Sequence, residues 1–138
     1  MVAEADERLA GVEGSSLEKL ADQLYEERSR KSIGDFSVTH RIQGFWDRAG
    51  TEIDLVAVNE AKQTIRFGSC KRSPGKLIAD VNNLKQHVAR FLQTVPTYQD
   101  WTHQLVGIAP ALDAEQRALL ASHDVIPQDL KDLTHGLE

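Results

Sequence analysis

Apolar residues recur every three or four positions near the start of the chain, from about residue 15 to about residue 31. This spacing is typical of a helix with one buried face. The residues of that face are Leu17, Leu20, Ala21, Leu24 and Tyr25. Gly34 interrupts the pattern, and we expect the helix to end before it.

Three strand-like runs follow, at residues 38–48, 52–58 and 64–71. The second run is rich in β-branched residues, and polar turns separate it from its neighbours. Strands joined by such short turns usually pair with each other. The sequence therefore predicts an antiparallel meander of three strands.

A second helix is predicted to begin after Ser73-Pro74-Gly75 and to continue unbroken to Pro96. Its apolar positions step by four and three, which is a strong amphipathic pattern: Leu77, Val81, Leu84, Val88, Phe91 and Val95. The remaining elements are a buried strand at 104–109, a helix from Asp113 to Ala121, an edge strand at 125–127 and a short helix or turn at 129–133. The order αβββαβαβ predicts an α/β (α+β) fold with a mixed central sheet flanked by helices.

The length of 138 residues fits one domain of ordinary size. We expect an N-terminal arm at 1–13, a domain at 14–135 and a tail at 136–138 of the kind that cloning leaves. The chain could be a fragment of a longer protein. The lone cysteine, Cys70, excludes an internal disulfide and fits a reducing, cytoplasmic compartment. Neither a signal peptide nor a membrane-spanning apolar run is recognisable.

Charge is unevenly distributed around a net value of −5. Between Lys62 and Arg90 the only acidic residue is Asp80, whereas seven basic residues occur there: Lys62, Arg66, Lys71, Arg72, Lys76, Lys85 and Arg90. Such a run is explained either by a solvated helix face or by a patch that binds nucleic acid. In the second case, Arg72, Lys76 and Lys85 are the candidate contacts.

Two neighbouring strands carry the residues that suggest chemistry. Asp54 lies in an apolar strand, where a carboxylate is rare unless it is paired or binds a ligand. Ser69-Cys70-Lys71 follows on the next strand, where a period of two puts Ser69 and Lys71 on one face. Metal-assisted phosphodiester hydrolysis uses carboxylates for Mg²⁺ and a cation near the attacking water. A plain ion pair between Asp54 and Lys71 is the alternative.

The run FWDRAGTEIDLVA at residues 45–57 and the run IRFGSCK at residues 65–71 carry a specific resemblance. They resemble the C-terminal domain of unknown function in archaeal-type P-loop ATPases, regarded as a member of the PD-(D/E)xK nuclease-like superfamily. The resemblance implies a restriction-endonuclease-like core and a P-loop ATPase in the same parent chain. It also implies Mg²⁺ or Mn²⁺ as cofactor and DNA as substrate. The implied site residues are Asp54 and Lys71 for catalysis, with Asp54 and Glu18 as metal ligands.

Ser69 departs from that family pattern, which has a glutamate at this position. A neutral hydroxyl is a weak ligand for a hard cation, so we expect Ser69 to lower the affinity for a metal ion. Glu52, two residues from Asp54, could compensate as a further ligand or could be a solvated strand end. Glu18 also has a second explanation, because Ser15-x-x-Glu18 fits a capping box.

Three functions remain open from the sequence. Because of Ser69, we favour a degenerate nuclease-like module that binds nucleic acid or regulates an attached ATPase. The alternatives are an active Mg²⁺- or Mn²⁺-dependent DNA nuclease, and a protein-interaction domain without nucleic-acid contact. The acidic overall charge would suit the last of these. Oligomeric state is not predicted.

Overall fold

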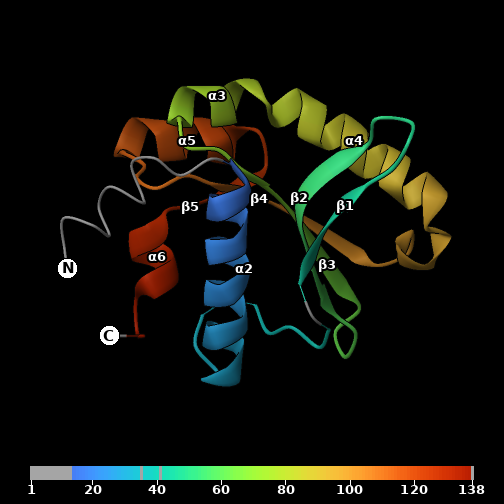
Figure 1. The fold of residues 1–138 in the computed structure, drawn as a ribbon, viewed down its shortest axis with the longest axis horizontal. Coiled ribbons are helices and arrows are strands. Elements are labelled where there is room, and N and C mark those ends of the chain that lie inside the picture. The colour runs from blue at the N-terminus through green and yellow to red at the C-terminus, as the bar shows by residue number, and fades with distance from the viewer. Residues whose placement is uncertain (1–13, 35, 41, 138) are drawn as a thin grey trace.

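The computed structural model describes residues 14–34, 36–40 and 42–137, and Figure 1 shows how their elements are arranged. The expected arm at 1–13 and the last tail residue lie outside these ranges. The elements are α2 (Gly14–Arg30), β1 (Gln43–Trp46), β2 (Glu52–Asn59), β3 (Thr64–Cys70), α3 (Pro74–Ala79), α4 (Val81–Thr94), η1 (Pro96–Tyr98), β4 (Thr102–Ile108), α5 (Ala114–Ser122), β5 (Val125–Gln128) and α6 (Leu130–Thr134).

The strands form one five-stranded sheet in the order β1-β2-β3-β4-β5. The first three pair antiparallel as the expected meander, and β3, β4 and β5 pair parallel. Helices α3 and α4 connect β3 to β4, and α5 connects β4 to β5, because parallel neighbours need crossover connections. The predicted α/β fold with a mixed sheet flanked by helices is confirmed.

Helices cover both faces of the sheet. On one face, α2 buries Leu17, Ala21 and Tyr25 in a cluster that includes Leu133 of α6. On the other face, α4 packs against β2 and β3, while α3 and α5 share a second cluster with β4 and β5. Figure 1 shows α2 and α6 side by side, with the α3–α4 segment along the opposite side of the sheet.

Gly68 allows close packing at the centre of the sheet, in the strand that carries Ser69. A Cβ built on Gly68 would lie 3.0 Å from a Val106 methyl and 3.1 Å from the Cβ of Leu55. Both neighbours belong to fully buried positions of the α2-side core. A side chain at position 68 would therefore push β2 and β4 away from β3.

The first strand is shorter than predicted, because β1 contains only Gln43–Trp46 instead of residues 38–48. Before it, Thr39 bonds to the Val58 carbonyl through both its amide and its hydroxyl, and the Ser29 hydroxyl accepts from the Val38 amide. These side-chain bonds compete with a regular ladder. The pairing with β2 also shifts register between Gln43 and Phe45.

The predicted second helix is wrong as a single unit. It consists of α3 and α4, which are separated at Asp80. The apolar periodicity continues through the break, because Leu77 and Val81 both remain buried. Periodicity alone could not show the interruption. No helix in the described ranges is long and apolar enough to cross a membrane.

Candidate functional site

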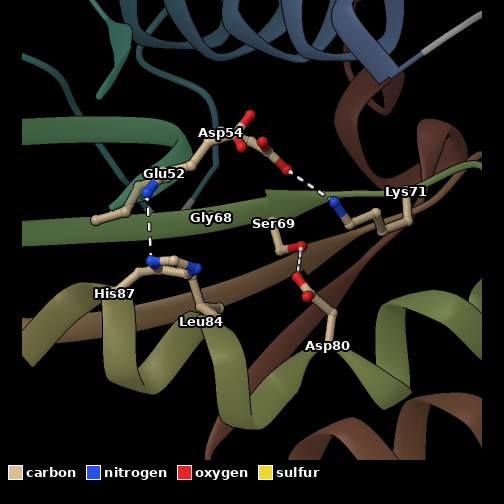
Figure 2. A pocket seen from close by; sticks show the side chains of 9 residues that line it. Glu52, Asp54, Gly68, Ser69, Lys71, Asp80, Leu84 and His87 are labelled. Carbon is tan, nitrogen blue, oxygen red and sulfur yellow. Dashed lines mark hydrogen bonds and ion pairs between the residues drawn. The ribbon is translucent and has the colours of Figure 1, made fainter. Parts of the chain in front are cut away.

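A small pocket of about 80 Å³ opens where β2 begins and β3 ends, facing the junction of α3 and α4. Figure 2 shows the side chains that line it. The lining residues are Glu52, Ile53, Asp54, Gly68, Ser69, Lys71, Asp80, Leu84 and His87. The structure therefore brings together four residues that the sequence singled out on β2 and at the end of β3: Glu52, Asp54, Ser69 and Lys71.

Side chains along β2 stop alternating regularly between the two faces of the sheet at Asp54. Ile53 belongs to the core under α4, whereas Leu55 belongs to the core under α2. Residues two apart on a regular strand would share one face, so the regular pattern is broken between them. At this point the Asp54 carboxylate accepts a hydrogen bond from the Cys70 amide at 2.8 Å. A side chain thus replaces a backbone partner at the end of β3.

Asp54 and Lys71 form the central pair of opposite charges in the pocket. The Lys71 Nζ lies 3.8 Å from Oδ2 of Asp54 (Figure 2). The Asp54 side chain is 9% exposed, and the Lys71 side chain is 37% exposed. The ammonium group can therefore reach a ligand in solvent while it stays beside the carboxylate.

Glu18 of α2 is the second carboxyl group at Asp54, as the resemblance implied. The pKa of Glu18 is raised from 4.5 to about 8, first by burial, then by the negative charge of Asp54 and a hydrogen bond between the two carboxyl groups. The charges of Glu52 and Asp22 raise it further. Two carboxyl groups can hydrogen-bond only if they share a proton, and this proton occupies the place that a cation could take.

Asp22, one helical turn after Glu18, belongs to the same acidic group. Burial raises its pKa to about 7, with further contributions from the charges of Glu26 and Asp54. Its Oδ1 atom is buried and has no hydrogen-bond partner within the described ranges. Sequence reasoning missed Asp22. The four-residue spacing of Glu18, Asp22 and Glu26 along one helix face was a signal that could have found it.

The capping-box explanation of Glu18 depends on the Ser15 side chain, which lies outside what the structure describes. The structure places Glu18 beside Asp54, and its role as a metal ligand stays a prediction. Glu52 is exposed at the pocket rim, and its amide donates to Nδ1 of His87 at 3.3 Å. His87, which the sequence did not single out, thus fixes the start of β2 to α4.

Ser69, the substituted position, points toward the helices rather than toward Asp54. Its hydroxyl donates to Oδ2 of Asp80 at 3.1 Å (Figure 2). The other oxygen of Asp80 accepts a bond from the Asn83 amide group at 3.3 Å. Asp80 is a pocket carboxylate that the sequence did not predict, because the expected unbroken helix placed no special residue there.

Cys70 points away from the pocket, as expected from its position between Ser69 and Lys71. It is buried in the core under α2. Burial, and then the negative charge of Asp54, raise the pKa of its thiol well above the usual value. The neutral thiol is a packing group and not a nucleophile.

The three expected nucleic-acid contacts do not gather at the pocket. Arg72 and Lys76 are exposed near the start of α3, but neither lines the pocket. Lys85 lines a separate hollow of about 360 Å³ beside β4 and β5. Arg66, part of the same basic run, is 1% exposed and donates to Tyr25 and Gln104.

The carboxyl groups of the pocket fit a loosely held cation better than an enclosed one. In residues 14–34, 36–40 and 42–137, no group of three or more His, Cys, Asp or Glu side chains is arranged to hold a metal ion. The contact between Glu18 and Asp54 nevertheless provides two adjacent oxygen donors. Mg²⁺ needs only one or two carboxylates when it keeps several waters. The donor set therefore fits a hydrated divalent cation.

Comparison with known proteins identifies one family. The model of the DUF234 family, described as archaeal and bacterial proteins of unknown function, matches residues 2–95 of the chain. This range contains α2, the antiparallel meander, α3 and α4, and with them every pocket residue described above. No curated protein and no solved structure matches the chain.

Proposed function

Because the chain belongs to the DUF234 family, whose function is unknown, we propose a function from its pocket: a nuclease-like module that binds nucleic acid through a divalent cation. One observation carries the proposal. Asp54 and Lys71, 3.8 Å apart, share one open pocket with the carboxyl group of Glu18 adjacent. Carboxylates for a hard cation and an ammonium for a phosphate are the two requirements of phosphodiester recognition.

Charge explains why a cation belongs in the proposal. Carboxyl groups outnumber Lys71 around the pocket, and without a counter-charge they would repel a phosphate. Glu18 and Asp54 would hold the cation, and when bound it would neutralise them and attract a phosphate oxygen. Lys71, at the solvent edge, is placed to contact the same phosphate.

Ser69 is the reason why we propose binding as the main activity. The residue at this position is neutral and adds no charge to the donor set. We infer that the module cleaves nucleic acid slowly or not at all, in line with a degenerate PD-(D/E)xK site. The runs at 45–57 and 65–71 support a restriction-endonuclease-like ancestry and a parent chain with a P-loop ATPase domain. The lone cysteine, Cys70, favours a protein of the reducing cytoplasm.

An active Mg²⁺- or Mn²⁺-dependent DNA nuclease is the second candidate. The observation that favours it is Asp80, whose carboxylate lies beside Ser69 in the pocket. A carboxylate delivered from the helix could offset the missing glutamate. Lys71 would then assist the attacking water, as in the family that the sequence resembles.

Fluorescence anisotropy of labelled single- and double-stranded DNA tests the proposal. Affinity is measured with Mn²⁺, with Mg²⁺ and with a chelator, while gel analysis of the same samples detects cleavage. We expect the cation to strengthen binding about tenfold or more, which corresponds to about 1.4 kcal/mol. Asp54→Asn should lose this gain. Asp100→Asn, at an exposed carboxylate before β4 at the other end of the sheet, should keep it.

The outcomes separate the candidates. Cation-dependent binding without cleavage supports the degenerate module. Cleavage that requires both the cation and Asp54 supports the nuclease. If DNA is not bound under any condition, both candidates fail and a protein-interaction domain becomes the better explanation.

A further inference from the structure

Trp46, the last residue of β1, is exposed far more than a large aromatic side chain normally is. It is 76% exposed, whereas the preceding Phe45 is half-buried and contacts the Phe91 ring. The other exposed large apolar residue in the described ranges is Leu119 of α5, a helix that packs on β5 at the opposite edge of the sheet. Trp46 therefore stands alone on its surface. A protein interface has an apolar core of several residues, so a lone ring fits a single stacking partner better.

The strand that carries Trp46 is poorly suited to pair with a strand of another protein. β1 forms one edge of the sheet (Figure 1), but it has only four residues. Its register with β2 also shifts between Gln43 and Phe45. Short and irregular edge strands hinder pairing with a further strand. A partner is therefore expected to contact the ring of Trp46 and not the backbone of β1.

A hydrogen-bonded turn after β1 holds Trp46 close to a cation. The Asp47 carboxylate accepts from the amides of Ala49 and Thr51, both at 3.0 Å, and the Asp47 amide donates to the Thr51 carbonyl at 3.0 Å. Arg48 is exposed in this turn, two residues after Trp46. An exposed guanidinium can bind a phosphate group. The turn thus offers a phosphate contact next to the aromatic ring.

Trp46 also borders the pocket that contains Lys71. Its direct partner in the antiparallel pair is Glu52, which lines this pocket. Paired residues lie on the same face of a sheet, with Cβ atoms about 5 Å apart. The exposed Glu52 carboxylate would repel a phosphate placed beside Trp46. A nucleobase carries no charge, so this place suits a base whose neighbouring phosphates lie at Lys71 and Arg48.

We propose that Trp46 is a stacking platform for one unpaired base of a single-stranded nucleic acid that the pocket holds by its phosphates. This inference rests on the proposed function, because a phosphate at Lys71 is what brings the strand to Trp46. Every base has a π-face, so the ring adds affinity for any sequence. Bases inside a duplex are stacked on each other and have to be extruded first. The module therefore prefers single-stranded to double-stranded nucleic acid.

Fluorescence anisotropy with two labelled strands of equal length, in the presence of Mn²⁺, separates the base from the phosphates. One strand is oligodeoxycytidylate, and the other has stable abasic units on the same phosphodiester backbone. We expect the natural protein to bind the base-bearing strand about tenfold more tightly. Trp46→Ala should bind both strands equally, and Trp46→Phe, which keeps a ring, should retain most of the preference. Leu119→Ala, which removes the other exposed apolar side chain, should leave the preference unchanged.

Indole fluorescence detects stacking without relying on Trp46→Ala. In a Trp101→Phe background Trp46 is the remaining tryptophan, and the base-bearing strand should quench its emission whereas the abasic strand should not. Equal affinity of the natural protein for the two strands, or a preference that persists in Trp46→Ala, overturns the stacking role. The proposed function then stands, provided that binding still requires Asp54 and the cation. If neither strand is bound, both proposals are overturned.

Discussion

At the scale of single residues, burial and neighbouring negative charges raise the pKa values of Glu18 and Asp22 on α2, so we expect the stability of the protein to depend on pH. Burial, and then the charge and hydrogen bond of Asp54, raise the pKa of Glu18 to about 8. Burial, with the charge of Glu26 next, raises the pKa of Asp22 to about 7. At neutral pH, Glu18 is therefore mostly protonated. It can bind a cation only when this proton leaves.

The raised pKa values predict that the folded state loses stability as pH rises. Folded Glu18 and Asp22 hold their protons more tightly than the unfolded chain, in which the ordinary values are 4.5 and 3.8. Their contribution to stability is complete below those values and is lost as pH rises through about 7 to 8. Glu18→Gln should flatten this decline.

Unfolding temperatures of the natural protein and Glu18→Gln, measured without cation between about pH 5 and about pH 9, check this prediction. The natural protein should lose several degrees more than the variant over this range. Equal slopes for the two proteins would show that Glu18 titrates normally.

Arg117 of α5 forms two ion pairs with acidic residues at the start of α6. Its guanidinium donates to Asp129 at 2.7 Å and to Asp132 at 2.8 Å, which fixes α5 to α6. Burial opposes ionisation of Asp129, but amide bonds from Asp132 and Leu112 and the Arg117 charge hold its pKa below the ordinary value. Arg117→Ala should cost about 2 kcal/mol, since it leaves the 7%-exposed Asp129 side chain without its cation.

Urea unfolding measures that loss, and Arg90→Ala on the exposed face of α4 is the control. The control should change stability by less than about 0.5 kcal/mol. A loss in Arg117→Ala no larger than in the control would contradict the role of the ion pairs. Because Asp129 has a lowered pKa, its contribution is present above its ordinary value of 3.8 and is lost only as pH falls below it.

The sequence was sufficient for those site residues that lie in recognisable local patterns. Asp54 and Lys71 were singled out because a carboxylate in an apolar strand and a lysine at a strand end are visible along the chain, and Ser69 because it departs from the family pattern that the run at 65–71 resembles. Asp80 was missed because its role depends on a contact with Ser69 on another element. Arg66 was assigned to a basic run, yet it is buried over the Phe36 ring at 4.8 Å. A charge pattern does not show whether an arginine has buried partners.

At the scale of elements, periodicity predicted where helices and strands occur but not where they are interrupted. The apolar stripe from Leu77 to Phe91 is continuous, since α3 and α4 both pack on the same side of the sheet. The break at Asp80 is not visible in the sequence, where nothing indicates the contact between Asp80 and Ser69 of β3. The irregular pairing of β1 and β2 near Asp54 was not predicted for the same reason. At this point the Asp54 side chain bonds to the Cys70 amide, which belongs to the next strand.

Phe91 anchors α4 to the sheet, so we expect its loss to destabilise the protein. Its ring makes edge contacts with Phe45 and Phe67, at centroid distances of 4.9 and 5.2 Å. Phe91→Ala should destabilise the protein by about 3–5 kcal/mol through lost burial and a cavity. The exposed apolar Leu119 of α5 provides the control, and Leu119→Ala should cost less than about 0.5 kcal/mol.

Urea unfolding of both variants provides the comparison. A cost for Phe91→Ala below about 1 kcal/mol would mean that α4 is held mainly by other contacts. In that case the α4 wall of the pocket, with Leu84 and His87, would not depend on this aromatic cluster.

At the scale of the whole molecule, the pocket forms where elements far apart in the sequence meet. Asp54 comes from β2, Lys71 follows β3 and Asp80 lies between the crossover helices. Helix α2 adds Glu18 beside Asp54. The element order and the antiparallel meander could be predicted, because both follow from local patterns and short connections. The mixed character of the sheet was predicted too, but the places of β4 and β5 in the strand order, their register and the approach of α2 to the start of β2 could not be, since long-range packing decides them.

The unfolding temperature, measured with and without Mn²⁺ at about pH 8, shows whether this pocket holds a divalent cation. A cation that binds only the folded state should stabilise the natural protein by about 2.7 kcal/mol at one hundred times its dissociation constant. Asp54→Asn should show no such increase, and Asp100→Asn should show all of it. An unchanged unfolding temperature in the natural protein, or an equal increase in Asp54→Asn, would mean that Asp54 and its pocket do not bind the cation.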